Sequence, residues 1–157
     1  DIRIEGGEEV ADVRVRGVAR LRAISIGGEL VVRALDELPL LGALATLADG
    51  ETVVADAAEL RVKESDRAAA TVALCRAFGA EADERPDGFV IRGRESLQAA
   101  TVQSFGDHRI AMSAAVLALA AAGTTRPTKI LDVHNVATSF PNFPWLIGTL
   151  GGEIKTV

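Results

Sequence analysis

Basic side chains stand at the predicted starts of two helices, where helix electrostatics alone disfavour them. Lys63 and Arg67 lie around the start of one predicted helix, and His108 and Arg109 open a second. The N-terminal end of a helix carries a partial positive charge and unpaired backbone N–H groups, so a cation there is unfavourable unless an anion binds beside it. These four cations therefore predict an anion site.

Carboxylates also stand at predicted helix starts. Asp36 precedes a further predicted helix, and Glu64 lies among the cations of the first. Both are candidate general acids or bases, because neighbouring cations hold a carboxylate ionised or tune its proton affinity. If the helix starts converge, they form a pocket for a compact polyanion with phosphate and carboxylate groups. The alternative is that the arginines pair with Asp66 and Asp107, which are natural helix N-caps, and bind no ligand.

The elements that must position these residues follow from hydrophobic periodicity and turn residues. Strand-like stretches alternate with amphipathic helices, which predicts an α/β (α+β) fold. The expected helices are residues 38–48, 66–78, 107–122 and 140–150. The expected strands are residues 10–16, 52–55, 81–83, 89–91, 101–105, 129–133 and 153–157, with a hairpin turn at Asp87-Gly88.

The two halves of the chain resemble each other. Asp36-Glu37, Gly50 and the Phe78-Gly79-Ala80-Glu81 run each recur about 72 residues later, as Asp107-His108, Gly123 and Leu150-Gly151-Gly152-Glu153. We therefore predict two copies of a βαβαββ-type unit within the single domain 1–157. The first copy covers about residues 18–93, and the second about residues 97–157.

Composition excludes several classes of protein. The 157 residues are 48% hydrophobic with a net charge of −5, which indicates a folded domain and disfavours a nucleic-acid partner. The longest apolar stretch, residues 110–123, is too short to span a membrane. The single cysteine, Cys75, rules out an internal disulfide or a multi-cysteine metal site and fits a reducing compartment. Because the chain begins at Asp1 without Met, we expect a fragment or a processed chain.

Four short motifs stand out in the sequence: Arg61-Val62-Lys63-Glu64-Ser65-Asp66-Arg67, Asp107-His108-Arg109-Ile110-Ala111-Met112, the Ala34–Leu40 segment around Asp36-Glu37, and Ala137-Thr138-Ser139-Phe140-Pro141. They resemble signature segments of the enolpyruvyl transferases, in particular the EPSP synthase (3-phosphoshikimate 1-carboxyvinyltransferase) family. Their order and spacing also match, and the resemblance covers the whole chain.

The resemblance implies a fold and an activity. Members of the family transfer the enolpyruvyl group of phosphoenolpyruvate to the 5-hydroxyl of shikimate 3-phosphate in aromatic amino acid biosynthesis. They use no cofactor and no catalytic metal, act in the cytoplasm, and are the target of glyphosate. Their inside-out α/β fold has two lobes of three βαβαββ units each. Two units correspond to a partial C-terminal lobe with about half of the active site, which implies a chain that is inactive without the N-terminal lobe.

The resemblance also implies roles for individual residues. Asp36 would contact the attacking hydroxyl and help remove its proton, and Glu64 would deliver a proton to the methylene carbon of phosphoenolpyruvate. The others would bind substrate: Lys63 between the two substrates, and Arg67, His108 and Arg109 at the phosphate and carboxylate of phosphoenolpyruvate.

Two departures and two alternatives accompany this resemblance. Some members carry lysine where Thr138 stands, and some carry Asn where Glu59 stands. One alternative is the sister transferase that acts on UDP-N-acetylglucosamine, in which the motif from Arg61 to Arg67 is not expected. The other is a non-catalytic anion-binding or scaffold module of the same fold.

Overall fold

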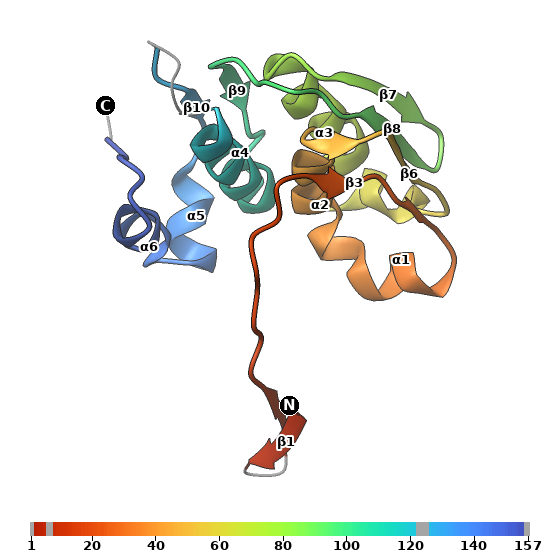
Figure 1. Ribbon diagram of the computed structural model, residues 1–157, viewed down its shortest axis with the longest axis horizontal. Helices are drawn as coiled ribbons and strands as arrows, with labels where there is room; N and C mark the ends of the chain where they lie inside the picture. The colour runs from red at the N-terminus through yellow and green to blue at the C-terminus, as the bar shows by residue number, and fades with distance from the viewer. Residues whose placement is uncertain (1, 6–7, 122–125, 156–157) are drawn as a thin grey trace.

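A four-stranded mixed sheet forms one side of the domain (Figure 1). The computed structural model describes residues 2–5, 8–121 and 126–155. The strand order is β4-β6-β8-β7, in which β4 runs parallel to β6 and the other neighbours are antiparallel. The bounds of these strands are Ser25–Ile26 for β4, Glu51–Val54 for β6, Glu81–Arg85 for β7 and Gly88–Arg92 for β8.

Two helices cover one face of this sheet and enclose the main core. They are α2 (Leu38–Ala45) and α3 (Arg67–Ala77), and both pack on β8. Side chains from the helices and from alternate positions of β8, such as Phe89 and Ile91, form one buried apolar cluster. Because the apolar residues of α3 recur at helical spacing and Asp66 caps its first turn, this segment is a helix that begins at the edge of the core.

A third helix connects this layer to the C-terminal part of the chain. Helix α4 (His108–Ala120) packs on α2 at one side and on α5 (His134–Ser139) at the other (Figure 1). It joins β9 (Thr101–Gln103) to β10 (Lys129–Leu131), and these two strands pair in parallel. Two further apolar clusters lie along α4, the second of them under α6 (Phe143–Thr149).

The remaining elements are short. Strands β1 (Ile2–Glu5) and β2 (Glu8–Ala11) form an antiparallel hairpin that stands apart from the rest (Figure 1). Strand β3 (Leu21–Arg22) pairs in parallel with β5 (Ala48–Asp49). Helix α1 (Glu29–Ala34) leads into a 3₁₀ turn, η1 (Leu35–Glu37), and a second turn, η2 (Ala58–Val62), precedes α3. None of the described helices is both long and apolar enough to cross a membrane.

The mixed α/β architecture predicted from the sequence is confirmed, whereas three element assignments were wrong. The predicted strand 10–16 is a strand only at residues 10–11, which end β2, and residues 12–16 are exposed coil that pairs with none of the described strands. Residues 140–150 contain a helix only from Phe143, and a separate helix, α5, precedes it. Residues 153–155 form no strand, and 156–157 lie outside the described residues, as does Gly123. The division into units 18–93 and 97–157 stays a prediction.

Among the described glycines, Gly93, just after β8, lies closest to another stretch of backbone. A Cβ atom there would lie 1.6 Å from the carbonyl oxygen of Ala48 and 2.7 Å from its carbonyl carbon. Gly93→Ala should therefore lower the free energy of unfolding by about 2 kcal/mol or more, since the backbone must move. Urea denaturation of the chain measures this value.

Gly148→Ala is the matched control. A Cβ at Gly148 meets nothing within 4 Å, and the residue lies inside α6. Alanine is favoured over glycine in a helix, so this variant should be unchanged or more stable by up to about 1 kcal/mol. A Gly93→Ala chain as stable as the wild type would contradict the close approach.

Candidate active site

Arg67 is the first residue of α3, yet only 1% of its side chain is exposed. Its guanidinium donates hydrogen bonds to carboxylates from three other places in the chain. Nε reaches Asp107 Oδ2 at 2.8 Å, Nη1 reaches Asp36 Oδ1 at 2.8 Å, and Nη2 reaches Glu64 Oε2 at 2.6 Å. A longer contact of 3.4 Å joins Nη2 to Asp107 Oδ1, so the interaction between Arg67 and Asp107 is bidentate.

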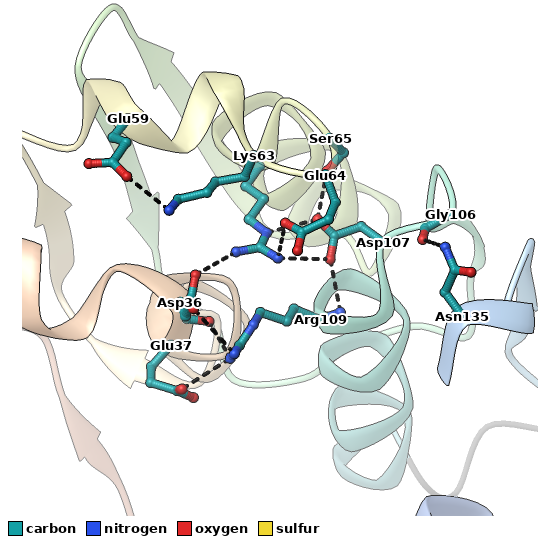
Figure 2. A network of polar contacts seen from close by, with 11 residues as sticks. Asp36, Glu37, Glu59, Lys63, Glu64, Ser65, Gly106, Asp107, Arg109 and Asn135 are labelled. Atoms are coloured by element: carbon teal, nitrogen blue, oxygen red, sulfur yellow. Dashed lines mark hydrogen bonds and ion pairs between the residues drawn. The ribbon is translucent and has the colours of Figure 1, made fainter. Parts of the chain in front are cut away.

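Asp107 is fully buried and links the two helix starts (Figure 2). It caps α4 by accepting the backbone N–H of Arg109 at 2.9 Å, and it accepts the hydroxyl of Ser65 at 3.0 Å. Burial alone would raise the pKa of Asp107, but the hydrogen bonds from Arg67, Arg109 and Ser65 and the charge of Arg67 outweigh burial and hold that pKa below its ordinary value. The carboxylate is therefore charged in the folded protein at neutral pH.

The turn that leads into Asp107 has an unusual backbone. Phe105 and Gly106 both have positive φ, 57° and 69°, a region that Phe rarely adopts. The side-chain amide of Asn135, on α5, donates a hydrogen bond to the carbonyl oxygen of Gly106 (Figure 2). Ser104 accepts the backbone N–H of Asp107 at 3.0 Å through its carbonyl. Contacts from both sides of the turn thus fix where α4 begins.

Arg109 contacts the 3₁₀ turn η1 (Figure 2). Its Nη1 donates to the backbone oxygen of Asp36 at 2.9 Å and to Glu37 Oε1 at 3.0 Å, and its Nη2 lies 3.4 Å from Asp36 Oδ2. The side chain is 28% exposed, in contrast to that of Arg67. Asp36 therefore faces both arginines, and the carboxylate is the place where η1, α3 and α4 meet.

Two predicted site residues stand outside this network. Lys63 pairs with Glu59 at 2.9 Å, and that hydrogen bond raises the pKa of its ammonium group. His108 opens α4 and is half-buried, and its side chain makes no hydrogen bond or ion pair with any residue that the structure describes. Of the six predicted site residues, the structure thus joins Asp36, Glu64, Arg67 and Arg109.

The predicted alternative, in which the arginines pair with Asp66 and Asp107 and bind no ligand, is confirmed only for the pairing of Arg67 with Asp107. Arg67 does pair with a carboxylate cap, but with Asp107 of the other helix, while Asp66 caps its own helix and pairs with Arg61. From the sequence, Asp107 was expected to cap a helix or to pair with an arginine, but no tertiary contact was assigned to Ser65, Glu37 or Asn135. Because these partners lie far apart in the chain or in turns, local spacing carried no signal for them.

The last motif is placed differently from the expectation. Thr138 and Ser139 end α5 instead of opening the final helix, and Asn142 occupies the N-cap position of α6 without a capping side-chain hydrogen bond. Since cap hydrogen bonds form only with the backbone of a following helix, the motif's Ser and Thr do not act as caps here. His134 and Asn135 begin α5.

The network has more negative than positive charge. Among the described residues, the carboxylates of Asp36, Glu37, Glu64 and Asp107 surround the guanidinium groups of Arg67 and Arg109. Guanidinium groups can hold phosphate or carboxylate oxygens, and the carboxylates can transfer protons. No group of three or more possible metal ligands occurs in the described part of the chain. The arrangement fits proton transfer beside an anionic ligand.

Comparison with known proteins decides the family. The protein-family model for EPSP synthase (3-phosphoshikimate 1-carboxyvinyltransferase) matches residues 2–146. The chain belongs to the EPSP synthase family. A 3-phosphoshikimate 1-carboxyvinyltransferase of Geobacter sulfurreducens is 51% identical over 147 residues, which cover 94% of this chain and 33% of that protein. A second, from Geobacter sp. strain M21, is 52% identical over 153 residues, or 98% and 34%.

A solved structure agrees with this assignment. EPSP synthase from Acinetobacter baumannii superposes with a TM-score of 0.87 at 37% identity, over 95% of this chain and 34% of that one. The chain thus spans about a third of the length of the EPSP synthases that it matches.

The buried pair generates a stability prediction. Asp107→Asn removes the charge that faces Arg67 and leaves a buried guanidinium short of a partner. Breaking a buried ion pair from one side costs about 3–5 kcal/mol, and we expect the lower figure because Asp36 and Glu64 remain in place. The free energy of unfolding in urea at pH 7 measures the loss.

Acid should reduce the difference in the free energy of unfolding between the wild type and Asp107→Asn. Because the folded-state pKa of Asp107 lies below its unfolded value, near 3.9, its charge stabilises the fold above that value and the contribution is lost as pH falls through the folded-state pKa. The wild type and Asp107→Asn should therefore converge below about pH 4. Asp66→Asn is the control: Asn caps helices as well as Asp, so its loss should stay below about 1 kcal/mol. Equal losses in both variants would contradict the account.

Proposed function

We propose that this chain is part of a 3-phosphoshikimate 1-carboxyvinyltransferase, which transfers the enolpyruvyl group of phosphoenolpyruvate to the 5-hydroxyl of shikimate 3-phosphate. In this proposal Asp36 and Glu64 are catalytic, and Lys63, Arg67, His108 and Arg109 bind substrate. The observation that carries it is that Arg67 hydrogen-bonds to both Asp36 and Glu64, which brings a cation and two candidate proton-transfer groups together. Membership of the EPSP synthase family supports it independently.

The chemistry explains why such residues are needed. Attack of the hydroxyl oxygen on the central carbon of phosphoenolpyruvate requires a proton on the methylene carbon and loss of the hydroxyl proton. The tetrahedral product then releases phosphate and loses a proton from the new methyl carbon, which restores the double bond. Two groups suffice for both steps: one exchanges a proton with the hydroxyl oxygen, and the other exchanges a proton with the methylene carbon.

Asp36 and Glu64 are suited to these two tasks. Each lies within hydrogen-bond distance of Arg67, at 2.8 and 2.6 Å, and about half of each side chain is exposed. A substrate can therefore reach both carboxylates. In the proposed mechanism Asp36 accepts the hydroxyl proton, while Glu64 delivers a proton to the methylene carbon.

The arginines supply electrostatic stabilisation. The tetrahedral product carries phosphate and carboxylate on one carbon, and fixed guanidinium groups stabilise that charge without having to reorganise. Arg67 is held rigidly by its buried contacts, and Arg109 is open to solvent. Arg109 is therefore the side chain that an incoming anion meets first.

The surplus of carboxylates requires cations from elsewhere in the protein. We propose that the N-terminal lobe, within the two thirds of the relatives' length beyond this match, contributes them. On this account the enzyme acts in the cytoplasm, and residues 18–93 and 97–157 are two units of its C-terminal lobe. A full-length protein that binds phosphate but transfers no enolpyruvyl group would instead support a non-catalytic anion-binding module.

Glu64→Gln tests the catalytic assignment in the full-length protein. The substitution preserves shape and removes the titratable proton, so turnover should fall on the order of 100-fold or more, while shikimate 3-phosphate binds as before. Release of phosphate in the presence of both substrates measures turnover. Glu51→Gln, which removes an exposed partner of Arg92 on the sheet, is the control and should turn over normally. Wild-type turnover in Glu64→Gln would remove Glu64 from the mechanism.

Arg109→Lys tests the assignment of the phosphoenolpyruvate side. Lysine keeps the charge but cannot form two parallel hydrogen bonds to one anion, so phosphoenolpyruvate should bind on the order of tenfold more weakly. The binary complex with shikimate 3-phosphate should be nearly unchanged. Titration calorimetry with each ligand measures both. If the variant melts early while its affinities hold, Arg109 is a structural partner of η1 and α4 and not a ligand.

A further inference from the structure

The contacts of Arg109 are divided unevenly over its guanidinium group. Nη1 makes two hydrogen bonds of ordinary length, to the backbone oxygen of Asp36 at 2.9 Å and to Glu37 Oε1 at 3.0 Å. Because an Nη atom carries two hydrogens, these contacts use all of its donor capacity. Both acceptors belong to the same short turn, η1, so Nη1 is pinned to one place in the fold.

The opposite edge of the guanidinium is open. Nη2 has a single long contact, 3.4 Å to Asp36 Oδ2, and Nε donates to none of the described residues. The side chain is 28% exposed. An Nε–H and the neighbouring Nη2–H point in parallel, which is the arrangement that grips two oxygens of a carboxylate or phosphate. Arg109 thus presents a two-donor edge, formed by Nε and Nη2, whose one contact with the described residues is the long one to Asp36.

We infer that Glu37 is a positioning residue that sets the orientation of this edge for an anionic oxygen pair. This inference rests on the proposed function, in which Arg109 binds the carboxylate or phosphate of phosphoenolpyruvate. Glu37 touches neither ligand. It acts through Arg109: it holds Nη1 in place, so that Nη2 and Nε face the anionic ligand.

A competing role for Glu37 gives an effect of opposite sign. A carboxylate that merely neutralised Arg109 would compete with the anion, and its removal would tighten anion binding. If Glu37 instead positions Arg109, its removal would let the Arg109 side chain adopt many rotamers. Anion binding would then weaken, because this side chain would have to be ordered on binding. The sign of the change in affinity therefore separates the two roles.

Glu37 can also be replaced with little effect on the stability of the fold. Its side chain is 67% exposed, and exposed ion pairs contribute little to stability. Asp36, whose backbone oxygen holds the other hydrogen of Nη1, keeps that contact in any Glu37 variant. Replacement of Glu37 should therefore alter the orientation of Arg109 without unfolding the turn.

The test uses the full-length protein with Glu37→Ala and Glu37→Gln. Titration with phosphoenolpyruvate in the presence of shikimate 3-phosphate should show that Glu37→Ala raises the dissociation constant on the order of tenfold, below the roughly 100-fold that misplacing a group at the reaction centre can cause. The KM for phosphoenolpyruvate should rise in parallel, with kcat, the affinity for shikimate 3-phosphate and Tm nearly unchanged. Glu37→Gln should recover most of the loss, because its amide oxygen can still accept from Nη1.

The controls separate this inference from the proposed function. Glu51→Ala, which removes another exposed glutamate paired with an arginine, should leave phosphoenolpyruvate binding unchanged. Unchanged or tighter binding in Glu37→Ala, or a Gln variant as weak as the Ala variant, would overturn the positioning role while wild-type turnover upheld the proposed function. A wild type that binds phosphoenolpyruvate without turnover would refute the transferase, and the same titrations would still decide Glu37. A wild type that does not bind it would overturn both.

Discussion

The buried ion pair between Arg67 and Asp107 is the interaction on which the rest of the site depends. Both side chains are almost completely excluded from solvent, at 1% and 0% exposure, and they come from helix starts 40 residues apart. An isolated charge in such a place is strongly unfavourable, so each group requires the other. The pair therefore fixes the start of α3 relative to the start of α4.

The other contacts follow from that constraint. Once α3 and α4 are joined, Asp36 in η1 lies within reach of both arginines, and Arg109 extends back to the same turn. The result is one rigid cation and one accessible cation on either side of a shared carboxylate. An enzyme that stabilises a developing anion needs fixed charges of this kind, because charges that must reorganise in the reaction lose much of their effect.

Sequence reasoning located most of the regular elements but not the connections between them. Helices α3 and α4 and the hairpin of β7 and β8 have complete local signals: caps, helical spacing and an Asp-Gly turn. The stretch 10–16 has an alternating pattern, but only residues 10–11 have a partner strand, and α5 is too short to show periodicity. Arg67 and Asp36 were predicted as site residues from their positions at helix starts. Their contacts, and the role of Glu37, depend on tertiary packing that spacing along the chain does not encode.

A double-mutant cycle between Arg67 and Asp107 tests the central claim most directly. Arg67→Met, Asp107→Leu and the combined variant would be compared with the wild type by the free energy of unfolding in urea at pH 7. If the pair organises the site, each single change is severe, the double change recovers part of the loss, and the coupling energy is about 2–3 kcal/mol. Single effects that add to within about 0.5 kcal/mol would show that the two residues act independently and would contradict the account.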